Sequence, residues 1–173
     1  MKKAASIFLR AEIYPQDVEH LIKWMSNPRI VRYLHEDPDV VRELQRLLVT
    51  VPAPMLTFQF NRWGRFFIVC DPQGSAIGFV KMKSMASQGT YEIVFVIGEE
   101  GLWGNGYGKN AIRAALSTAF FEWRAKKVVA KIYAGNGRSI RSVQSCGFSC
   151  EYHEEPLFRY SITMDDYLDR LRA

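Results

Sequence analysis

Hydrophobic and polar residues alternate in several short stretches of the chain, and this two-residue period predicts β-strands. The first stretch, 7–13, contains aromatic and β-branched residues. Two more, 65–70 and 76–83, flank a turn at 71–74 that contains a proline and a glycine, so they predict a hairpin. Further strands are predicted at 91–98, 126–134, 150–154 and 157–163.

Other stretches place apolar residues three and four positions apart, which predicts helices. In 15–27, for example, Val18, Leu21, Ile22 and Met25 fall on one helical face. Hairpins followed by alternating strands and helices predict a mixed α/β sheet in a single domain, residues 1–173. The predicted helices are 15–27, 38–51, 106–124, 136–146 and 164–171.

Composition restricts the class of protein further. The chain has 173 residues, of which 48% are hydrophobic and 24% charged, which is typical of one globular domain with its own core. The formal charge of +5 favours anionic partners. The chain lacks a basic run with interleaved aromatic residues, which would indicate nucleic-acid binding. The apolar run near the N-terminus is too short for a signal peptide, and no apolar stretch reaches 18 residues. We therefore expect no membrane segment and a cytoplasmic location.

The stretch GLWGNGYGKNA, 101–111, places three alternating glycines between a predicted strand and a predicted helix. A glycine-rich turn of this kind brings backbone N–H groups close to phosphate, although it can also be only a tight turn. A Walker A loop would need glycine at Trp103 and Ser or Thr at Asn110. The dinucleotide-binding pattern would need glycine at Lys109 or Ala111. Neither nucleotide motif is therefore present.

The sequence WGNGYGKNA, followed about thirty residues later by NGRSIRSVQSCGF, resembles the GNAT superfamily of acetyl-CoA-dependent N-acetyltransferases. It is similar in particular to the subgroup that acetylates ribosomal-protein N-termini, aminoglycosides and polyamines. The resemblance extends over nearly the whole chain. It implies an α+β fold with a mixed sheet of about seven strands, flanked by helices and splayed at its centre. It also implies acetyl-CoA as the acyl donor and no metal.

The resemblance implies a set of residues that bind coenzyme A. The strand before the glycine turn would pair with the pantetheine arm, and one of its N–H groups would face the thioester carbonyl. The turn would hold the pyrophosphate through main-chain amides, because Trp103 replaces the usual Gln or Arg. The expected cofactor-binding residues are Phe95, Val96, Ile97, Trp103, Gly104, Asn105, Gly106, Tyr107, Gly108, Lys109, Asn136 and Ser139.

The expected chemistry is direct transfer of the acetyl group to a primary amine. Glu92 is the candidate base, although it can equally be an exposed or ion-paired strand carboxylate. The position of the family's acidic tyrosine is Val143, so that role is not carried over, and Ser142 or water is the candidate proton donor. Trp24 and Tyr33, on early elements that wall the acceptor pocket in the family, are candidate substrate contacts or core residues.

Two further hypotheses follow from the sequence, one of them disfavoured. The missing tyrosine and the replaced Gln or Arg also suit a non-catalytic acyl-CoA-binding regulatory module on the same fold. A zinc site at Cys146, Cys150 and His153 is disfavoured, since only three ligands are present and buried cysteines explain the pattern.

The expected partner is an amine, either a small molecule or a protein N-terminus, and the protein is expected to be a monomer or homodimer.

Overall fold

The computed structural model describes residues 5–173, and its centre is one seven-stranded sheet in the order β1-β2-β3-β4-β5-β7-β6. All neighbouring strands are antiparallel except β4 and β5, which are parallel. The mixed sheet of seven strands that the sequence predicted is therefore confirmed. The strands are β1 Phe8–Arg10, β2 Arg65–Cys70, β3 Ala76–Ser84, β4 Thr90–Ile97, β5 Lys127–Tyr133, β6 Ser149–Glu154 and β7 Leu157–Thr163.

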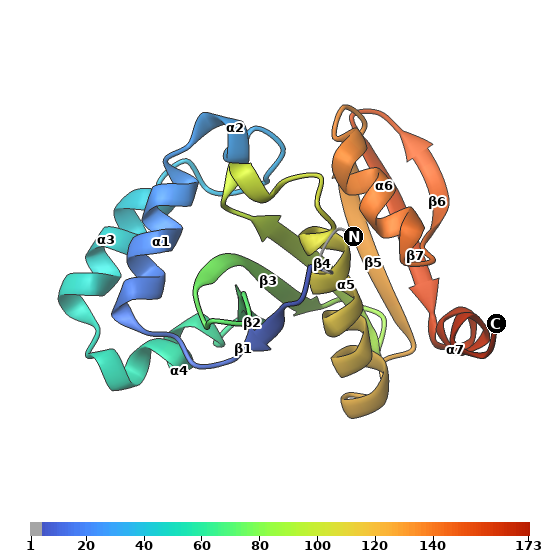
Figure 1. Cartoon of the computed structure of the whole chain (residues 1–173), viewed down its shortest axis with the longest axis horizontal. Coiled ribbons are helices and arrows are strands. Elements are labelled where there is room, and N and C mark those ends of the chain that lie inside the picture. Colours follow the sequence, from blue (N-terminus) through green and yellow to red (C-terminus); the bar gives the residue numbers. More distant parts are fainter. Residues whose placement is uncertain (1–4) are drawn as a thin grey trace.

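Helices cover both faces of this sheet (Figure 1). The N-terminal helices α1–α4 pack on one face, over β2 and β3, and the later helices α5 and α6 pack on the other. α7 follows β7 at the C-terminal end of the chain. The helices are α1 Pro15–Met25, α2 Pro28–Val31, α3 Val40–Thr50, α4 Leu56–Phe60, α5 Tyr107–Ser117, α6 Gly137–Ser145 and α7 Met164–Arg172.

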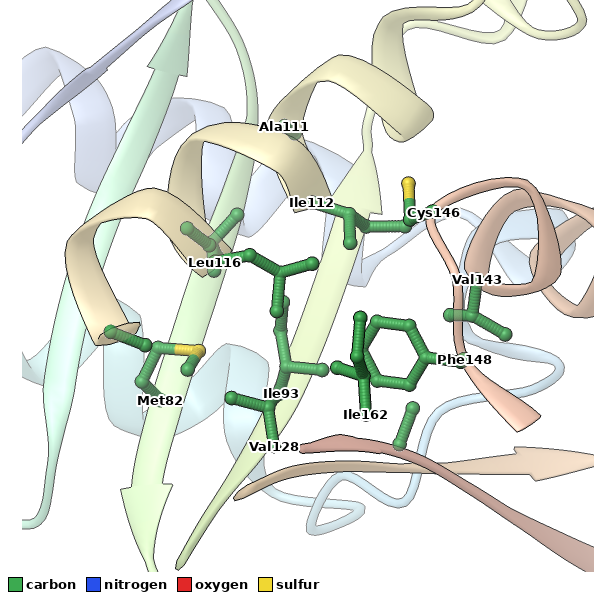
Figure 2. Close-up of a cluster of buried hydrophobic side chains, with 14 of the residues drawn as sticks. Met82, Ile93, Ala111, Ile112, Leu116, Val128, Val143, Cys146, Phe148 and Ile162 are labelled. Atoms are coloured by element: carbon green, nitrogen blue, oxygen red, sulfur yellow. The ribbon is translucent and has the colours of Figure 1, made fainter. Parts of the chain in front are cut away.

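The alternation of side chains along the strands divides the buried residues into two cores. On β3, Phe79 belongs to the core beneath α1 and α3, whereas the adjacent Val80 belongs to the core beneath α5. Figure 2 shows the second core, where Ile112 and Leu116 of α5 lie over Ile93 of β4. Apolar residues on both faces of the central strands explain why 91–98 is almost continuously hydrophobic.

The two parallel strands separate before their ends. β4 pairs with β5 only from Thr90 to Glu92, where Glu92 lies opposite Val129. β4 then continues to Ile97 and β5 to Tyr133 without further pairing between them. The splayed centre implied by the resemblance is thus present, and the gap opens directly toward the glycine-rich turn that follows β4.

The differences from the sequence prediction are local. The strand predicted at 7–13 is only Phe8–Arg10, and α2 and α4 were not predicted. The helix predicted at 106–124 changes at Thr118 into a π-helical turn, which ends at Glu122. Short helices and element ends depend on tertiary contacts more than on periodicity, so the pattern along the chain could not locate them. No helix among residues 5–173 combines the length and the apolar character that crossing a membrane requires.

Candidate active site in the gap between β4 and β5

The glycine-rich turn leads from β4 into the first turn of α5. Gly104 and Gly106 have φ values of +77° and +90°, in the left-handed region where residues with side chains are strained. Gly106 is the residue immediately before α5, and its carbonyl accepts the first helical hydrogen bond, from Asn110. The amides of the first helical turn therefore have no partner within the helix, and the positive end of the helix dipole lies beside them.

A cavity of about 310 Å³ lies in front of this turn and is called the loop cavity below. It collects residues from β4, the turn, α5 and α6, which are far apart in the sequence. Asn105 is the exception among the predicted cofactor-binding residues, because its exposed side chain donates to the carbonyls of Leu102 and Trp103. The predicted residues that line the cavity are Tyr33, Phe95, Val96, Ile97, Trp103, Gly104, Gly106, Tyr107, Gly108, Lys109, Asn136, Ser139 and Ser142.

Trp103 forms part of the cavity wall instead of projecting a donor into it. Its indole N–H donates to the carbonyl of Ile97 at 2.7 Å, which ties the turn to the end of β4. The guanidinium of Arg138 on α6 stacks on its ring, 3.6 Å from the ring centre. The side chain at the position of the usual Gln or Arg therefore positions a cation that comes from another element.

Three arginines, which the sequence analysis did not select, give the loop cavity a positive charge. Arg29, Arg138 and Arg141 line it together with Lys109. Partial burial lowers the pKa of the Arg138 guanidinium, and the neighbouring charges of Arg141 and Arg29 lower it further. Glu100 offsets one of these charges through an ion pair with Arg29 at 2.9 Å. An excess of cations beside free helix amides is the environment that a pyrophosphate requires.

The edge of β4 supplies unpaired peptide groups to the gap. The amide of Gly98 donates to the carbonyl of Ile77 on β3 at 2.8 Å. Because peptide groups alternate in direction along a strand, those of Phe95 and Ile97 face the opposite side, where β5 has moved away. Trp103 occupies the Ile97 carbonyl, which leaves the Ile97 N–H and both polar groups of Phe95 facing the gap.

α6 contributes hydroxyl groups to the other side of the loop cavity. Asn136 caps this helix, its side-chain oxygen accepting from the Ser139 amide at 3.4 Å. Ser142 Oγ donates to the carbonyl of Arg138 at 3.0 Å. Val143, which occupies the position of the family's tyrosine, is fully buried in the core beneath α5, so this position faces away from the cavity.

Glu92 lies in a second, smaller cavity of about 110 Å³, called the cleft below. The walls of the cleft and the loop cavity share five residues, so the two cavities meet in the gap between β4 and β5; the shared residues are Tyr33, Leu34, Phe95, Asn136 and Ser139. The Glu92 carboxylate is ion-paired with Lys131 Nζ of β5 at 3.7 Å. The structure thus brings together the predicted base and the predicted acyl-donor site, on two sides of the same junction.

The comparisons with known proteins agree with this geometry. The family model described as the acetyltransferase (GNAT) domain matches residues 7–149. The chain belongs to the acetyltransferase (GNAT) domain family. It is therefore an acetyltransferase by family, and its fold is the one that the sequence resemblance implied. No curated protein matches the chain at a significant level of sequence similarity.

Solved structures of similar fold cover nearly the whole GNAT chain. Spermidine N-acetyltransferase from Vibrio cholerae in complex with CoA and spermine has a TM-score of 0.77 and 23% identity, covering 94% of this chain and 98% of that chain. Aminoglycoside acetyltransferase AAC(6')-Ib in complex with coenzyme A has a TM-score of 0.76 and 18% identity, covering 97% and 100%. A domain from Methanocaldococcus jannaschii has a TM-score of 0.71 and 24% identity, covering 91% and 98%.

Trp24 does not fit the acceptor-binding role considered for it. Its side chain is only 1% exposed and stacks on His20, and its indole N–H donates to Glu99 at 3.1 Å. A Cβ added to Gly98 would lie 2.2 Å from this ring, so the tryptophan packs directly beneath the end of β4. A side chain so completely buried presents no surface to an acceptor, and its role in this GNAT chain is in the core.

The cysteine and histidine cluster near the C-terminus is dispersed in the structure. Cys146 is buried, as expected, and burial raises the pKa of its thiol. Cys150 is exposed on β6, which contradicts the expectation that both cysteines are buried. Within residues 5–173, no three His, Cys, Asp or Glu side chains are grouped so that they could hold a metal ion.

Proposed function

We propose that this GNAT chain transfers the acetyl group of acetyl-CoA directly to a primary amine. The observation that supports the proposal most strongly is the junction in the gap between β4 and β5. There the cation-lined loop cavity meets the cleft that contains Glu92, beside the unpaired edge of β4 at Phe95. Two of the similar structures are complexes with coenzyme A, which is consistent with this assignment.

The proposed donor site divides into two parts. The amides from Gly104 to Lys109 bind the pyrophosphate, and Arg138 and Arg141 add charge-assisted contacts to the phosphates. The pantetheine arm pairs with the free edge of β4, in place of the missing β5 contacts. This places the thioester carbonyl beside the Phe95 N–H, which is directed into the gap and is the proposed oxyanion donor.

The proposed reaction uses the residues at the junction. The amine nitrogen attacks the thioester carbonyl carbon, a C–N bond forms, and the C–S bond breaks when the tetrahedral oxyanion collapses. The amine must lose protons in this sequence, and Glu92, directly or through a water molecule, accepts one of them. Coenzyme A leaves as a thiolate and takes up a proton from Ser142 or from water. A thiolate is a tolerable leaving group, so the absence of a tyrosine at position 143 does not prevent the reaction.

A second candidate function is a non-catalytic acyl-CoA-binding module. It is favoured by one observation, namely that Val143 is buried and offers no acid at the family's tyrosine position. The two functions share acetyl-CoA binding but differ in turnover, and they can therefore be separated by experiment.

The experiment combines a binding assay with a turnover assay. Isothermal titration with acetyl-CoA is expected to give a dissociation constant in the micromolar range or tighter, about −8 kcal/mol. Thiol release from acetyl-CoA is then followed with dithionitrobenzoate across a panel of primary amines. Release that depends on the amine supports the acetyltransferase. Tight binding with no release for any amine favours the binding module, and no binding contradicts both.

A further inference from the structure

The charges around the cleft differ from those expected for a polycationic acceptor. Both carboxylates that line it are already ion-paired with lysines. Glu36 pairs with Lys81 Nζ of β3 at 2.5 Å, and Glu92 pairs with Lys131 Nζ at 3.7 Å. Lys83, which also lines the cleft, forms no ion pair with any of residues 5–173. The cleft therefore has three lysines against two carboxylates, and neither carboxylate is without a cation.

Lys83, the cleft lysine without an ion-pair partner among residues 5–173, lies close to the proposed base. In the register of β3 and β4, Lys83 lies directly opposite Glu92, and Lys81 lies opposite Val94. Residues two apart on a strand project from the same face, so both lysines border the same side of the cleft. An anionic group that approaches Lys83 would thus lie one strand away from Glu92.

A larger, apolar cavity of about 350 Å³ adjoins the cleft and is called the apolar pocket below. Glu36, Lys81 and Lys83 belong to the walls of both cavities. The pocket lies between β2 and β3 on one side and α1 and α3 on the other. Its volume is within the range of small-molecule sites. Besides the shared charged residues, its walls include Leu21, Met25, Val40, Leu44, Leu47, Phe60, Phe66 and Phe79.

Aromatic rings line the strand side of the apolar pocket. Phe66 of β2 contacts Phe60 and Phe79, with ring centres 5.0 and 5.3 Å apart. Phe66 lies opposite Lys81, and Lys81 lies opposite Val94. Because neighbouring strands are about 4.8 Å apart, the row from β4 to β2 spans roughly 10 Å. A molecule the size of phenylalanine can extend over such a distance, from the cleft into the pocket.

We propose that the preferred acceptor is a free amino acid with an apolar, preferably aromatic, side chain. Its amine lies beside Glu92, its carboxylate is bound by Lys83, and its side chain enters the apolar pocket. This inference rests on the proposed acetyl transfer and adds the class of acceptor. It also predicts that polyamines and aminoglycosides are poor substrates, because several positive charges would meet three lysines and no free carboxylate.

Matched amines test the three contacts separately. L-Phenylalanine tests all three, L-phenylalaninamide lacks the carboxylate charge, glycine lacks the side chain, and spermidine is a polycation. We expect kcat/KM in the thiol-release assay to be at least 10-fold lower for the amide and for glycine than for phenylalanine. Spermidine is expected to be at least 100-fold poorer. A kcat/KM for spermidine or for the amide equal to or above that of phenylalanine would overturn the proposal.

Two variants, each with a matched control, test whether Lys83 and the apolar pocket contact the acceptor. Lys83→Glu is expected to lower kcat/KM for phenylalanine at least 10-fold and to narrow or reverse the preference over the amide. The control is Lys126→Glu, at an exposed position just before β5, which should change neither kcat/KM for phenylalanine nor the preference over the amide.

Val40→Trp fills the apolar pocket from α3 and should raise KM for phenylalanine but not for glycine. Val49→Trp, on the same helix but 87% exposed, is its control.

A binding measurement separates this proposal from the proposed function. Calorimetric titration of L-phenylalanine into the protein saturated with coenzyme A measures the acceptor site without turnover. Saturable binding that is weakened by Lys83→Glu but not by Lys126→Glu supports the acceptor class, even if no acetyl transfer is detected. Absence of binding, or equal binding by both variants, overturns it, even if another amine is acetylated.

Discussion

The loop cavity and the cleft meet at the same junction but are built in different ways. The loop cavity is formed mainly by two continuous segments, the glycine turn with the start of α5 and the first turns of α6. The cleft is formed by residues 33–36 after α2 and 92–95 of β4, with pairs of residues from β3, β5 and the start of α6. The glycine turn leaves a motif in the sequence because its backbone conformation requires glycine at fixed spacing, whereas the charged residues of the cleft are brought together by strand register and leave none.

The two cavities also differ in how their charges are balanced. Four cations line the loop cavity, and one of them, Arg29, is paired with Glu100. In the cleft, lysines and carboxylates form pairs, with one lysine in excess. The first arrangement suits a ligand with several negative charges, and the second suits a ligand whose own charges are nearly balanced. Variants in one cavity are therefore expected to affect one substrate and spare the other.

The largest effect is expected from Gly106→Trp, which introduces a side chain at a φ of +90° in the wall of the loop cavity. We expect acetyl-CoA affinity to fall at least 10³-fold, about 4 kcal/mol, because the amides can no longer approach the pyrophosphate. Gly74→Trp is the matched control, since Gly74 has a φ of +87° and open space around it, but lies in the hairpin turn after β2. Titration showing equal losses in both variants would contradict the role of the loop.

The next largest effect is expected from Asp17→Asn, which lowers the stability of the fold at α1, a helix that lines the apolar pocket. Arg10 donates two hydrogen bonds of 2.8 Å to the Asp17 carboxylate, which is 3% exposed and also accepts from the Tyr14 amide. The hydrogen bonds to Asp17 raise the pKa of Arg10, and because a guanidinium stays protonated in proteins even without them, the cation remains charged when its partner is lost. Leaving this charge unpaired is expected to cost about 3 kcal/mol in the free energy of unfolding.

Urea denaturation measures this cost, with Asp39→Asn as the control. Asp39 forms an ion pair with Arg42 on the surface, at 3.8 Å. Loss of this pair is expected to lower the free energy of unfolding by less than about 1 kcal/mol. Because α1 forms a wall of the apolar pocket, Asp17→Asn should also raise KM for the acceptor more than it raises Kd for acetyl-CoA. Equal destabilisation by the two variants would contradict the importance of the buried pair.

Glu92→Gln is expected to separate the chemistry from donor binding. Loss of the base should lower kcat about 10²-fold, while Kd for acetyl-CoA stays within about threefold of the unmodified protein. An unchanged kcat would show that Glu92 is only the ion-pair partner of Lys131.

The smallest effect is expected from Arg138→Gln. Removing the guanidinium that stacks on Trp103 should weaken acetyl-CoA binding about 10-fold, with little change in KM for the acceptor. Arg42→Gln on α3, whose side chain is 80% exposed, is the control and should leave Kd unchanged. A change in acceptor KM without a change in acetyl-CoA Kd would reverse the assignment of the two cavities.

The fold and most residues that line the loop cavity were predictable from the sequence, whereas most of those that line the cleft and the apolar pocket were not. Hydrophobic periodicity located the strands and the longer helices, and the glycine spacing excluded the nucleotide motifs. Arg138 and Arg141 lie three residues apart just after the Asn136–Gly137 pair, and this spacing at the start of a predicted helix could have identified them. Lys83 gave no such signal, because its relation to Glu92 depends on strand register, and registers between strands arise only in the folded sheet.

Trp24 shows that the depth at which a residue is buried cannot be predicted from the sequence pattern. An aromatic residue on an early helix is equally compatible with a pocket wall and with the core, since periodicity assigns the residue to a face but not to a depth. Its 1% exposure and the close approach of Gly98 to its ring in the folded protein identify it as a core residue.

The most direct test of the account is a crystal structure of the protein with acetyl-CoA. We predict that the pyrophosphate contacts the amides between Gly104 and Lys109, and that the thioester oxygen lies within hydrogen-bonding distance of the Phe95 N–H. The acetyl group would then point from the loop cavity into the cleft, toward Glu92. A ligand bound elsewhere, or a thioester directed away from the gap between β4 and β5, would contradict the central claim.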